Sequence, residues 1–335
     1  MLNKKSLINR IIVGAVIFVV MIGMILMDVF LPNNEGASLQ FVGGRGINSV
    51  IISVIIALSV IEMRRAIGRE KIPDGFSWLL WLYAFGLGIA YSLFGFLGVA
   101  FFTLLVFACA AVTALVLNRA DSLIYIAFML VYPGLFMSSL LYLNRCASSF
   151  PISESSPMYK FLENDIWQYF NSRRGEGTQL LPYNAIGLAF VFAVSTFTDT
   201  FAYFVGGLFG KHKLCEEISP KKTVEGAIGG LFGGLIGSFV VFVLFDWTKV
   251  FGEQYGFTFS GLGMPVASIV AVYVVIGLLG SVMTQLGDLL ASLVKRHCDV
   301  KDYSKILGEH GGIMDRFDGI MLNAVFVAMV FMFII

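Results

Sequence analysis

Long apolar segments separated by short polar loops form the dominant pattern of this 335-residue chain. A helix needs about 20 mostly apolar residues to cross the hydrocarbon core of a bilayer. The pattern therefore predicts an all-α, polytopic integral membrane protein with about nine transmembrane helices. Because the stretch 76–117 is too long for one crossing, we expect it to fold back near Phe94 and Gly95. The candidate segments are 11–31, 47–62, 76–93, 94–117, 122–143, 183–208, 224–245, 264–286 and 319–335.

The positively charged residues predict how these helices are oriented. Short loops that carry Lys and Arg stay on the cytoplasmic side of a membrane. Nine crossings from a cytoplasmic N-terminus place all four basic loops inside and the C-terminus outside. These loops are 63–75 with Arg64, Arg65, Arg69 and Lys71, 118–121 with Arg119, 209–223 with Lys211, Lys213, Lys221 and Lys222, and 287–318 with Lys295, Arg296, Lys301, Lys305 and Arg316.

Polar interruptions divide the chain into three parts. The middle part is a polar segment on the outer side, and its amphipathic piece from Met158 to Phe170 is typical of a helix on the membrane surface. The chemistry is expected in the last part, because its two cytoplasmic loops mix cations, carboxylates, a histidine and glycines. The parts are 1–143 with about five transmembrane helices, 144–182, and 183–335 with the loops 209–223 and 287–318.

Composition narrows the class of protein further. Hydrophobic residues make up 58% of the chain and charged residues only 13%, with a mean hydropathy of +0.85. A soluble domain has about 25% charged residues, so the bilayer is the expected solvent. The net charge of +1 argues against a nucleic-acid partner, which requires a basic face. The four cysteines are scattered and have no spacing typical of a disulfide framework or a zinc site.

The segment 226–237 repeats glycine every four residues in two overlapping registers. This GxxxG spacing lets helix backbones approach each other closely. Tight helix packing is the simpler interpretation, and a smooth groove for an acyl chain is the alternative. A Walker-type phosphate loop is excluded, because no Gly-Lys-Ser/Thr follows the glycines.

Asp199 lies inside the apolar segment that precedes the basic loop 209–223. A carboxylate in a membrane span is costly and marks a functional site by default, with an Asp bonded to a neighbouring helix as the alternative. In the loop, Lys221, Lys222 and Thr223 precede the next predicted helix, whose free N-terminal amides favour anions. The loop therefore predicts a phosphate site, although lysines that contact anionic lipid headgroups would give the same pattern.

Carboxylates also flank the last cytoplasmic loop. Asp288, Ser292 and Lys295 fall on one face of the helix that enters it, and Asp315 and Asp318 lie one turn apart where the next helix begins. Because both helix ends border the same loop, these carboxylates can converge. Carboxylates, phosphate oxygens and waters are the usual ligands of Mg²⁺. The loop therefore predicts a magnesium and phosphate site.

The loop between these carboxylates contains His310, Gly311 and Gly312. Glycine permits positive φ and a close approach of the backbone to a ligand. We expect these residues to contact nucleotide or phosphate, with a purely structural histidine as the alternative.

The pattern Ser-x-x-Lys-Arg-x4-Lys-Asp-x-Ser-x3-Gly-x-His-Gly-Gly-x-x-Asp-Arg-x-Asp at 292–318 closely resembles the signature of phosphatidate cytidylyltransferases, also called CDP-diacylglycerol synthases. A second block, which runs from Asp199 through the Ser-Pro-Lys-Lys-Thr sequence to Gly226, resembles that family in the same order. The resemblance covers about 190–320. This chain departs from the family where Gly308-Glu309 replaces Pro-Gly and where Lys211 replaces a common Arg.

The resemblance implies that CTP and phosphatidate react to give CDP-diacylglycerol and pyrophosphate for phospholipid biosynthesis. It also implies Mg²⁺ as cofactor, with room for a second cation, and a dimeric, all-helical fold. The expected catalytic residues are Asp288, Lys295, Arg296, Lys301, Asp315 and Arg316; the expected substrate-binding residues are Asp199, Lys221, Lys222, Thr223, Ser292, His310, Gly311 and Gly312; and the expected metal-binding residues are Asp288, Asp315 and Asp318.

Two other classes stay open at this point. A CTP-dependent lipid kinase would release CDP in place of pyrophosphate, and a membrane transporter would bind its substrate near the bilayer midplane. The gathering of polar residues at one membrane face, late in the chain, favours the cytidylyltransferase. We expect a homodimer in a bacterial inner (plasma) membrane, with the active site facing the cytoplasm, where CTP is found.

Overall fold

The computed structural model describes residue 16 and residues 19–27, 44–144, 184–248, 265–308 and 311–334. Within these residues, helices alternate with short connections, and the regular strands form one small hairpin. Apart from Asn144, the predicted outer segment 144–182 with its amphipathic piece lies outside the described residues.

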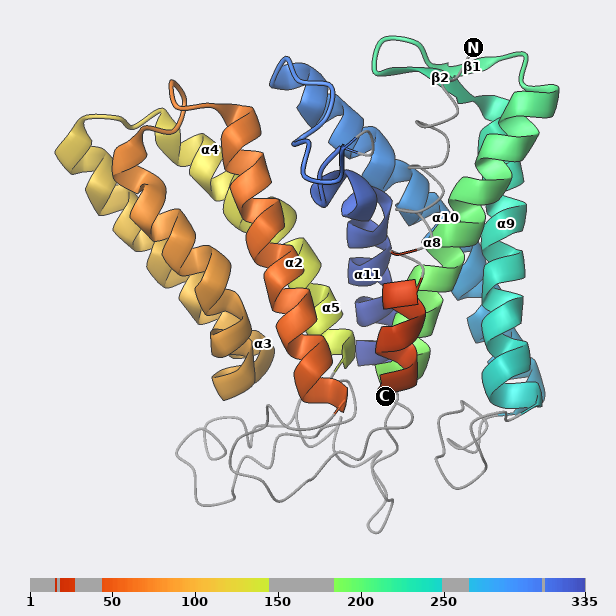
Figure 1. Ribbon diagram of the computed structural model, residues 1–335. Coiled ribbons are helices and arrows are strands. Elements are labelled where there is room, and N and C mark those ends of the chain that lie inside the picture. Colours follow the sequence, from red (N-terminus) through yellow and green to blue (C-terminus); the bar gives the residue numbers. More distant parts are fainter. Residues whose placement is uncertain are drawn as a thin grey trace, which may run out of the picture.

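The elements keep the labels of Figure 1. The α-helices are α2 (Gly44–Ile67), α3 (Ser77–Leu117), α4 (Ser122–Met129), α5 (Phe136–Asn144), α8 (Asn184–Phe209), α9 (Val224–Phe242), α10 (Val266–His297) and α11 (Met314–Ile334). A 3₁₀ turn (Asp74–Phe76) precedes α3, and π-helical turns join α4 to α5 (Leu130–Leu135) and extend α9 (Val243–Trp247). The strands are β1 (Lys213–Cys215) and β2 (Ser219–Thr223).

Several of these elements are long and apolar enough to cross a membrane. This confirms the prediction of an all-α membrane protein. The count of nine crossings and the sides on which the termini lie stay predictions, and the segment 11–31 is described only in part. In the described part of the chain the six candidate spans are Gly46–Ile67, Asp74–Leu117, Ser122–Asn144, Ala185–Phe209, Val224–Trp247 and Val266–His297.

Helix α3 folds back on itself, as its length predicts. Gly95 has φ 62° and ψ −149°, a conformation open to glycine but strained for other residues. The hydroxyl groups of Tyr83 and Thr103 are hydrogen-bonded at 3.3 Å, whereas a straight helix would separate these residues by about 30 Å. The predicted turn near Phe94 and Gly95 is thus confirmed, and α3 forms two antiparallel arms.

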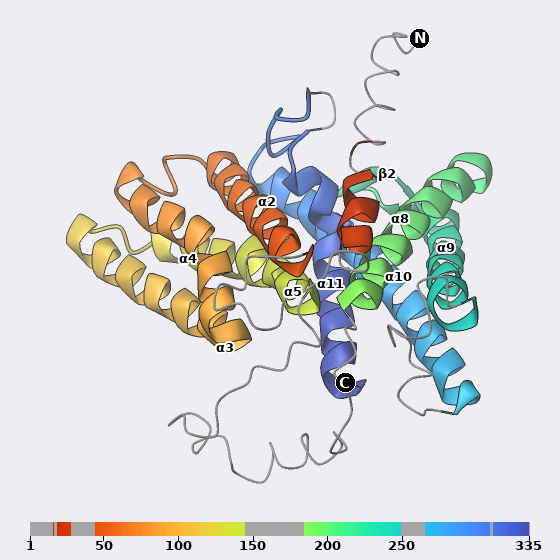
Figure 2. The ribbon, with the colours of Figure 1, turned by 60° about the horizontal axis from the view of Figure 1, so that its bottom comes forward.

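Helix α11 joins the N-terminal helices to the C-terminal ones. Figures 1 and 2 show α2 to α5 on one side of the molecule, α8 to α10 on the other, and α11 between them. Accordingly, α11 packs against α5 and α2 as well as against α8 and α10. Asn323 in α11 anchors the second contact, because its Nδ2 donates to the carbonyl of Val191 at 3.1 Å and to Ser195 Oγ at 3.0 Å.

The glycines of α9 pack against two neighbouring helices. Gly226 and Gly237 lie against the backbone of α8, whereas Gly234 lies against Gly277 of α10. A Cβ added at Gly237 would lie only 2.8 Å from the carbonyl oxygen of Ala193. The interpretation as tight helix packing is confirmed. Because these glycines are buried, they do not line an open groove for an acyl chain.

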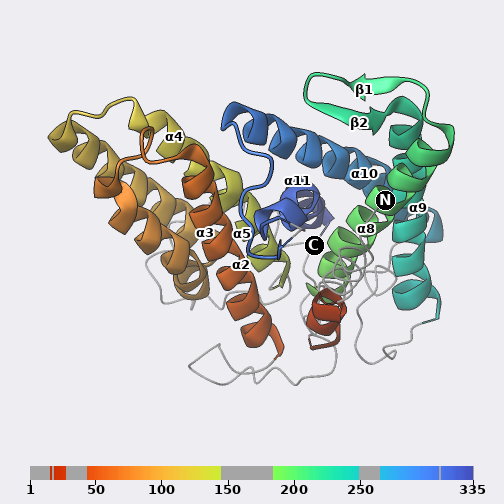
Figure 3. The ribbon, with the colours of Figure 1, turned by 45° about the horizontal axis from the view of Figure 1, so that its top comes forward.

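The polar connections gather at one end of the bundle. The α2–α3 turn, the β1–β2 hairpin and the α10–α11 loop lie at the top of Figure 1, and Figure 3 shows the same end brought forward. The C-terminal end of α11 lies at the opposite end. This arrangement agrees with the prediction that the basic loops share one side of the membrane.

The β1–β2 hairpin has no counterpart in the sequence interpretation of the loop 209–223. Lys213 pairs with Thr223 and Cys215 with Ser219 in antiparallel register. The Lys213 ammonium also donates to the carbonyl of Pro220 at 2.6 Å. The hairpin gives the basic loop a defined shape at the start of α9.

Candidate functional site

The start of α11 is pressed against the end of α10, and this contact positions the predicted carboxylates. A Cβ added at Gly287 would lie 2.6 Å from the carbonyl oxygen of Asp318, and one added at Gly319 would lie 2.9 Å from the side chain of Thr284. The two backbones can meet because both positions are glycine. Asp288 follows Gly287 directly, and its charge acts on Asp318. The predicted convergence of the two helix ends is therefore confirmed.

Lys295 links the two helix ends electrostatically. Its Nζ lies 2.8 Å from Asp315 Oδ1 and 3.9 Å from Asp318 Oδ2, and the charge of Asp288 also acts on it. Only 15% of the Lys295 side chain and 4% of the Asp315 side chain are exposed. A buried charge is costly unless it is paired, so the lysine and the carboxylates depend on one another.

Asp315 also organises the loop before α11. Its Oδ2 accepts the backbone N–H of Tyr303 at 2.9 Å and that of Gly312 at 2.8 Å. Gly311 has φ +79°, and a Cβ there would lie 2.6 Å from the same carboxylate oxygen. The Gly-Gly pair thus allows the backbone to fold closely around Asp315. The predicted contact of Gly311 and Gly312 with nucleotide or phosphate stays a prediction.

A second ion pair connects the β1–β2 hairpin to α10. Lys222 Nζ lies 2.6 Å from Asp288 Oδ2, and the two side chains are 25% and 35% exposed. The charge of Asp288 acts on both Lys295 and Asp318, so we call the five residues of these two ion-paired groups the Lys–Asp cluster. Its members are Lys222, Asp288, Lys295, Asp315 and Asp318.

Two residues fix the start of α9 beside this cluster. Thr223 is the N-cap, and its Oγ1 accepts the N–H of Gly226 at 3.1 Å. Glu225, in the first turn, accepts the backbone N–H groups of Lys211 and His212 and lies 2.6 Å from His212 Nδ1. The hydroxyl oxygen of Thr223 therefore has a capping role, and its predicted part in substrate binding stays a prediction.

Asp199 is exposed on α8, and charged residues in and beside the Lys–Asp cluster interact with it electrostatically. Asp288, Lys222 and Arg316 all act on it, and Asp199 in turn acts on Asp318. The structure therefore brings a carboxylate from α8 into the electrostatic surroundings of the Lys–Asp cluster. This placement favours the functional interpretation of Asp199 over a purely structural one.

The carboxylate oxygens of the Lys–Asp cluster suit a divalent cation. Mg²⁺ is usually held by one or two carboxylates together with waters and substrate phosphates. The charges of Asp288 and Asp318 act unfavourably on each other, and a cation beside them would relieve this repulsion. Asp315 is the least available ligand, because both of its oxygens already accept hydrogen bonds. No group of three or more His, Cys, Asp or Glu side chains that could hold a metal occurs among the described residues, so phosphate oxygens would have to complete the shell.

The other predicted cations are exposed. Within the described residues, three of them form no ion pair with the carboxylates of the Lys–Asp cluster. Arg316 is also exposed, and its charge acts on Asp199. Ser292 is half-buried on α10, and His310 lies outside the described residues. The three exposed cations are Lys221, Arg296 and Lys301.

Glu62 is a residue of this region that the sequence interpretation missed. It is fully buried in α2, and its carboxylate accepts the Ser304 hydroxyl at 2.6 Å and the N–H groups of Ile313 and Met314 at 3.0 and 2.8 Å. Negative charge is favourable at a helix N-terminus, so Glu62 holds the start of α11 in place. A signal was present, because Glu62 is a carboxylate at the end of the apolar segment 47–62.

Comparison with known proteins agrees with this picture. The model of the Cytidylyltransferase family matches residues 8–334. Proteins named phosphatidate cytidylyltransferase from Staphylococcus aureus and Staphylococcus epidermidis are 39% identical to this chain over 155 residues, and one from Staphylococcus haemolyticus is 38% identical over 155 residues. Each alignment covers 46% of this chain and 50% of the relative, so the chain spans about half the length of the curated relatives it matches. Because the family model matches nearly the whole chain, this protein belongs to the cytidylyltransferase family.

Proposed function

We propose that this protein transfers the cytidylyl group of CTP to phosphatidate and so forms CDP-diacylglycerol and pyrophosphate for phospholipid biosynthesis. The observation that carries the proposal is the Lys–Asp cluster, which joins α10, α11 and β2 at the polar end of an apolar bundle. Its lysines suit phosphate groups and its carboxylates suit a divalent cation. The similarity to proteins named phosphatidate cytidylyltransferase supports phosphatidate as the acceptor.

The reaction needs alignment and charge neutralisation more than a strong base. A phosphate oxygen of phosphatidate attacks the α-phosphorus of CTP and forms a new P–O bond. The bond from the α-phosphorus to the bridging oxygen breaks, and pyrophosphate leaves with that electron pair. Because the attacking oxygen is already anionic, the protein contributes mainly positive charge and position. Lys222 and Lys295 supply the charge, and phosphate oxygens would compete with Asp288 and Asp315 for them.

Asp288 and Asp318 would hold Mg²⁺, with Asp315 orienting the surroundings or adding an oxygen ligand. Bound there, the ion would neutralise phosphate charge as a Lewis acid. A second cation nearby is part of the same proposal, because Asp199 adds a further negative charge to the region.

The proposed active site faces the cytoplasm of a bacterial inner (plasma) membrane. The gathering of basic loops at one end of the bundle supports this orientation, because such loops stay inside. CTP is a cytosolic nucleotide, and the phosphate of the lipid lies at the depth where the helices end. We also propose a homodimer, which light scattering of the detergent-solubilised protein would test against a single-chain mass.

The decisive experiment uses purified protein in detergent with phosphatidate, Mg²⁺ and CTP labelled in either the cytosine or the γ-phosphate. We expect cytosine label in the lipid phase and γ-label in released pyrophosphate. Label from the γ-phosphate in the lipid would instead make the protein a kinase. No transfer of either label by folded protein would contradict both activities and favour a transporter. As a control, Asp288→Asn should remove transfer while the protein still inserts into membranes.

A further inference from the structure

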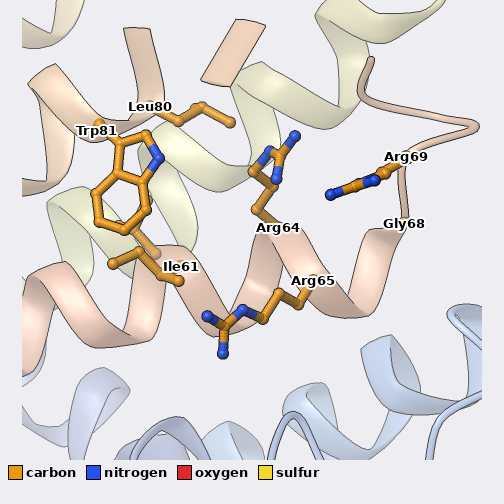
Figure 4. A pocket seen from close by; sticks show the side chains of 8 residues that line it. Ile61, Arg64, Arg65, Gly68, Arg69, Leu80 and Trp81 are labelled. Carbon is orange, nitrogen blue, oxygen red and sulfur yellow. The ribbon is translucent and has the colours of Figure 1, made fainter. Parts of the chain in front are cut away.

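A cavity of about 310 Å³ lies where α2 ends and α3 begins, outside the Lys–Asp cluster. Figure 4 shows the arginine-bearing end of α2 on one side of it and Leu80 and Trp81 of α3 on the other. No residue of this cavity belongs to the predicted catalytic, substrate or metal sets. The lining residues are Val60, Ile61, Arg64, Arg65, Gly68, Arg69, Leu80 and Trp81.

Positive charge in this cavity exceeds the negative charge beside it. Arg64 Nη2 lies 2.7 Å and Arg69 Nε 3.5 Å from the same oxygen of Asp74. Arg65 is exposed and, among the described residues, pairs with no carboxylate. A guanidinium stays charged at any physiological pH. Two of the three arginines therefore share one carboxylate and the third has none among the described residues, so the cavity carries a net positive charge.

Arg64 adds an unsatisfied donor to this charge. Only 18% of its side chain is exposed, and its Nε is buried with no hydrogen-bond partner among the described residues. A buried donor without an acceptor is unfavourable, and structures normally satisfy it. Because this nitrogen has almost no accessible surface, the exposed 18% of the Arg64 side chain is the part that an anion in the cavity would contact. Phosphate oxygens match guanidinium groups especially well because they accept parallel hydrogen bonds.

The remaining walls are apolar and lead to the outer surface of the bundle. Leu80 is buried, whereas Trp81 is partly exposed and stacks on Phe85 with ring centroids 5.7 Å apart. Tryptophan is enriched where a bilayer meets water. Further exposed apolar side chains continue along α2 and α3 from this point, including Val54, Leu82 and Ile89. A ligand with a phosphate at one end and hydrocarbon at the other fits this arrangement better than a free phosphate does.

We propose that this cavity binds the phosphate group of an anionic membrane phospholipid, whose acyl chains lie along the exposed apolar faces of α2 and α3. No lining residue belongs to the Lys–Asp cluster, so the cavity would hold a lipid in addition to the one that reacts. Arg64 and Arg65 contact the phosphate, and Trp81 packs against the glycerol and upper acyl chain. The inference does not depend on the proposed activity, because binding requires no CTP.

The test measures quenching of tryptophan fluorescence in the purified full chain, without CTP, by brominated phosphatidylglycerol or brominated phosphatidylcholine in mixed micelles. We expect the anionic lipid to quench preferentially and Trp81→Phe to remove most of that difference. Arg65→Gln should weaken the preferential binding by about tenfold or more, as expected for loss of a charge-assisted contact. Arg119→Gln, an exposed arginine at the same end of the bundle, is the matched control and should behave like the unaltered protein.

Three outcomes would overturn the proposal. Equal quenching by the two lipids would show that the cavity does not select an anion. Unchanged binding by Arg65→Gln, and by Arg64→Gln if that variant stays folded, would remove the arginines from the site. If millimolar inorganic phosphate displaced the lipid, and the protein bound inorganic phosphate as tightly as it bound the lipid, the cavity would be a site for free phosphate. Arg65 is exposed and unpaired in the described structure, so its substitution should leave the fold intact.

Discussion

The Lys–Asp cluster and the α2–α3 cavity lie at the same end of the bundle but balance their charges differently. In the cluster, Lys222 lies against Asp288 and Lys295 against Asp315. At the cavity, Arg64 and Arg69 share Asp74, and Arg65 pairs with no carboxylate among the described residues. Charges that are paired can be buried, whereas unpaired charges need solvent or a ligand. We therefore expect substitutions in the buried Lys295–Asp315 pair to affect stability and turnover together, and substitutions in the cavity to affect lipid binding alone.

The largest effect is expected from breaking the buried pair of the cluster. Lys295→Met leaves Asp315 without its cation in a site that is almost closed to solvent, and the loss of one partner of a buried pair costs about 3–5 kcal/mol. We expect a lowered unfolding temperature and no measurable cytidylyl transfer. Thermal unfolding in detergent and the labelled-CTP assay would measure the two effects separately.

A double variant sharpens this test. Lys295→Met with Asp315→Asn removes both charges, so most of the lost stability should return while activity stays absent. Equal instability in the single and double variants would mean that the pair does not act as a unit. Normal activity in either variant would exclude Lys295 from the reaction.

The next largest effect is expected at Glu62, the α2 residue whose carboxylate accepts hydrogen bonds from the start of α11. Glu62→Ala leaves the N–H groups of Ile313 and Met314 without their acceptor, at a cost of about 1–3 kcal/mol for a buried unsatisfied donor. Because Asp315 directly follows Met314, we expect kcat to fall more than KM rises. Glu62→Gln keeps an acceptor oxygen and should restore most of kcat.

The exposed Glu70, in the turn that follows α2, provides the matched control. Glu70→Ala should leave both kinetic constants and the unfolding temperature unchanged. If Glu62→Ala behaved in the same way, the start of α11 would be held by its own loop and Glu62 would have no positioning role.

A smaller effect is expected where α10 meets α11. Gly287→Ala places a methyl group 2.6 Å from the carbonyl oxygen of Asp318, and overpacking of this kind costs about 1–3 kcal/mol. We expect partial loss of activity, because Asp288 and Asp318 must move apart. Gly207→Ala, where nothing lies within 4 Å of the added Cβ, should be nearly neutral in both assays. Equal results for the two alanines would show that the helices can separate without consequence.

Local patterns predicted the helices and the faces they present, but not the partners of their charged residues. The helical period was enough to place Asp288, Ser292 and Lys295 together on α10, and length alone indicated the fold-back of α3. Nothing local connects Glu62 to Met314, which is 252 residues further along the chain. The Lys222–Asp288 contact likewise depends on the β1–β2 hairpin. The sequence of β2 does not alternate between apolar and polar residues, so it gave no sign of a strand. Long-range polar contacts of this kind are decided by packing, so they could not be predicted from spacing.

The smallest effect on stability, and the sharpest separation of stability from activity, is expected at Lys222. Its pair with Asp288 is partly exposed, and such pairs contribute less than about 1 kcal/mol. Lys222→Ala should therefore unfold at nearly the normal temperature. If the lysine leaves Asp288 to contact substrate phosphate, kcat/KM should nevertheless fall by about tenfold or more, as expected for a charge-assisted hydrogen bond. Lys305→Ala removes an exposed lysine from the α10–α11 loop and should change neither quantity. Normal kcat/KM in Lys222→Ala would leave the residue with a structural role only, because the contact with Asp288 would then be its whole contribution.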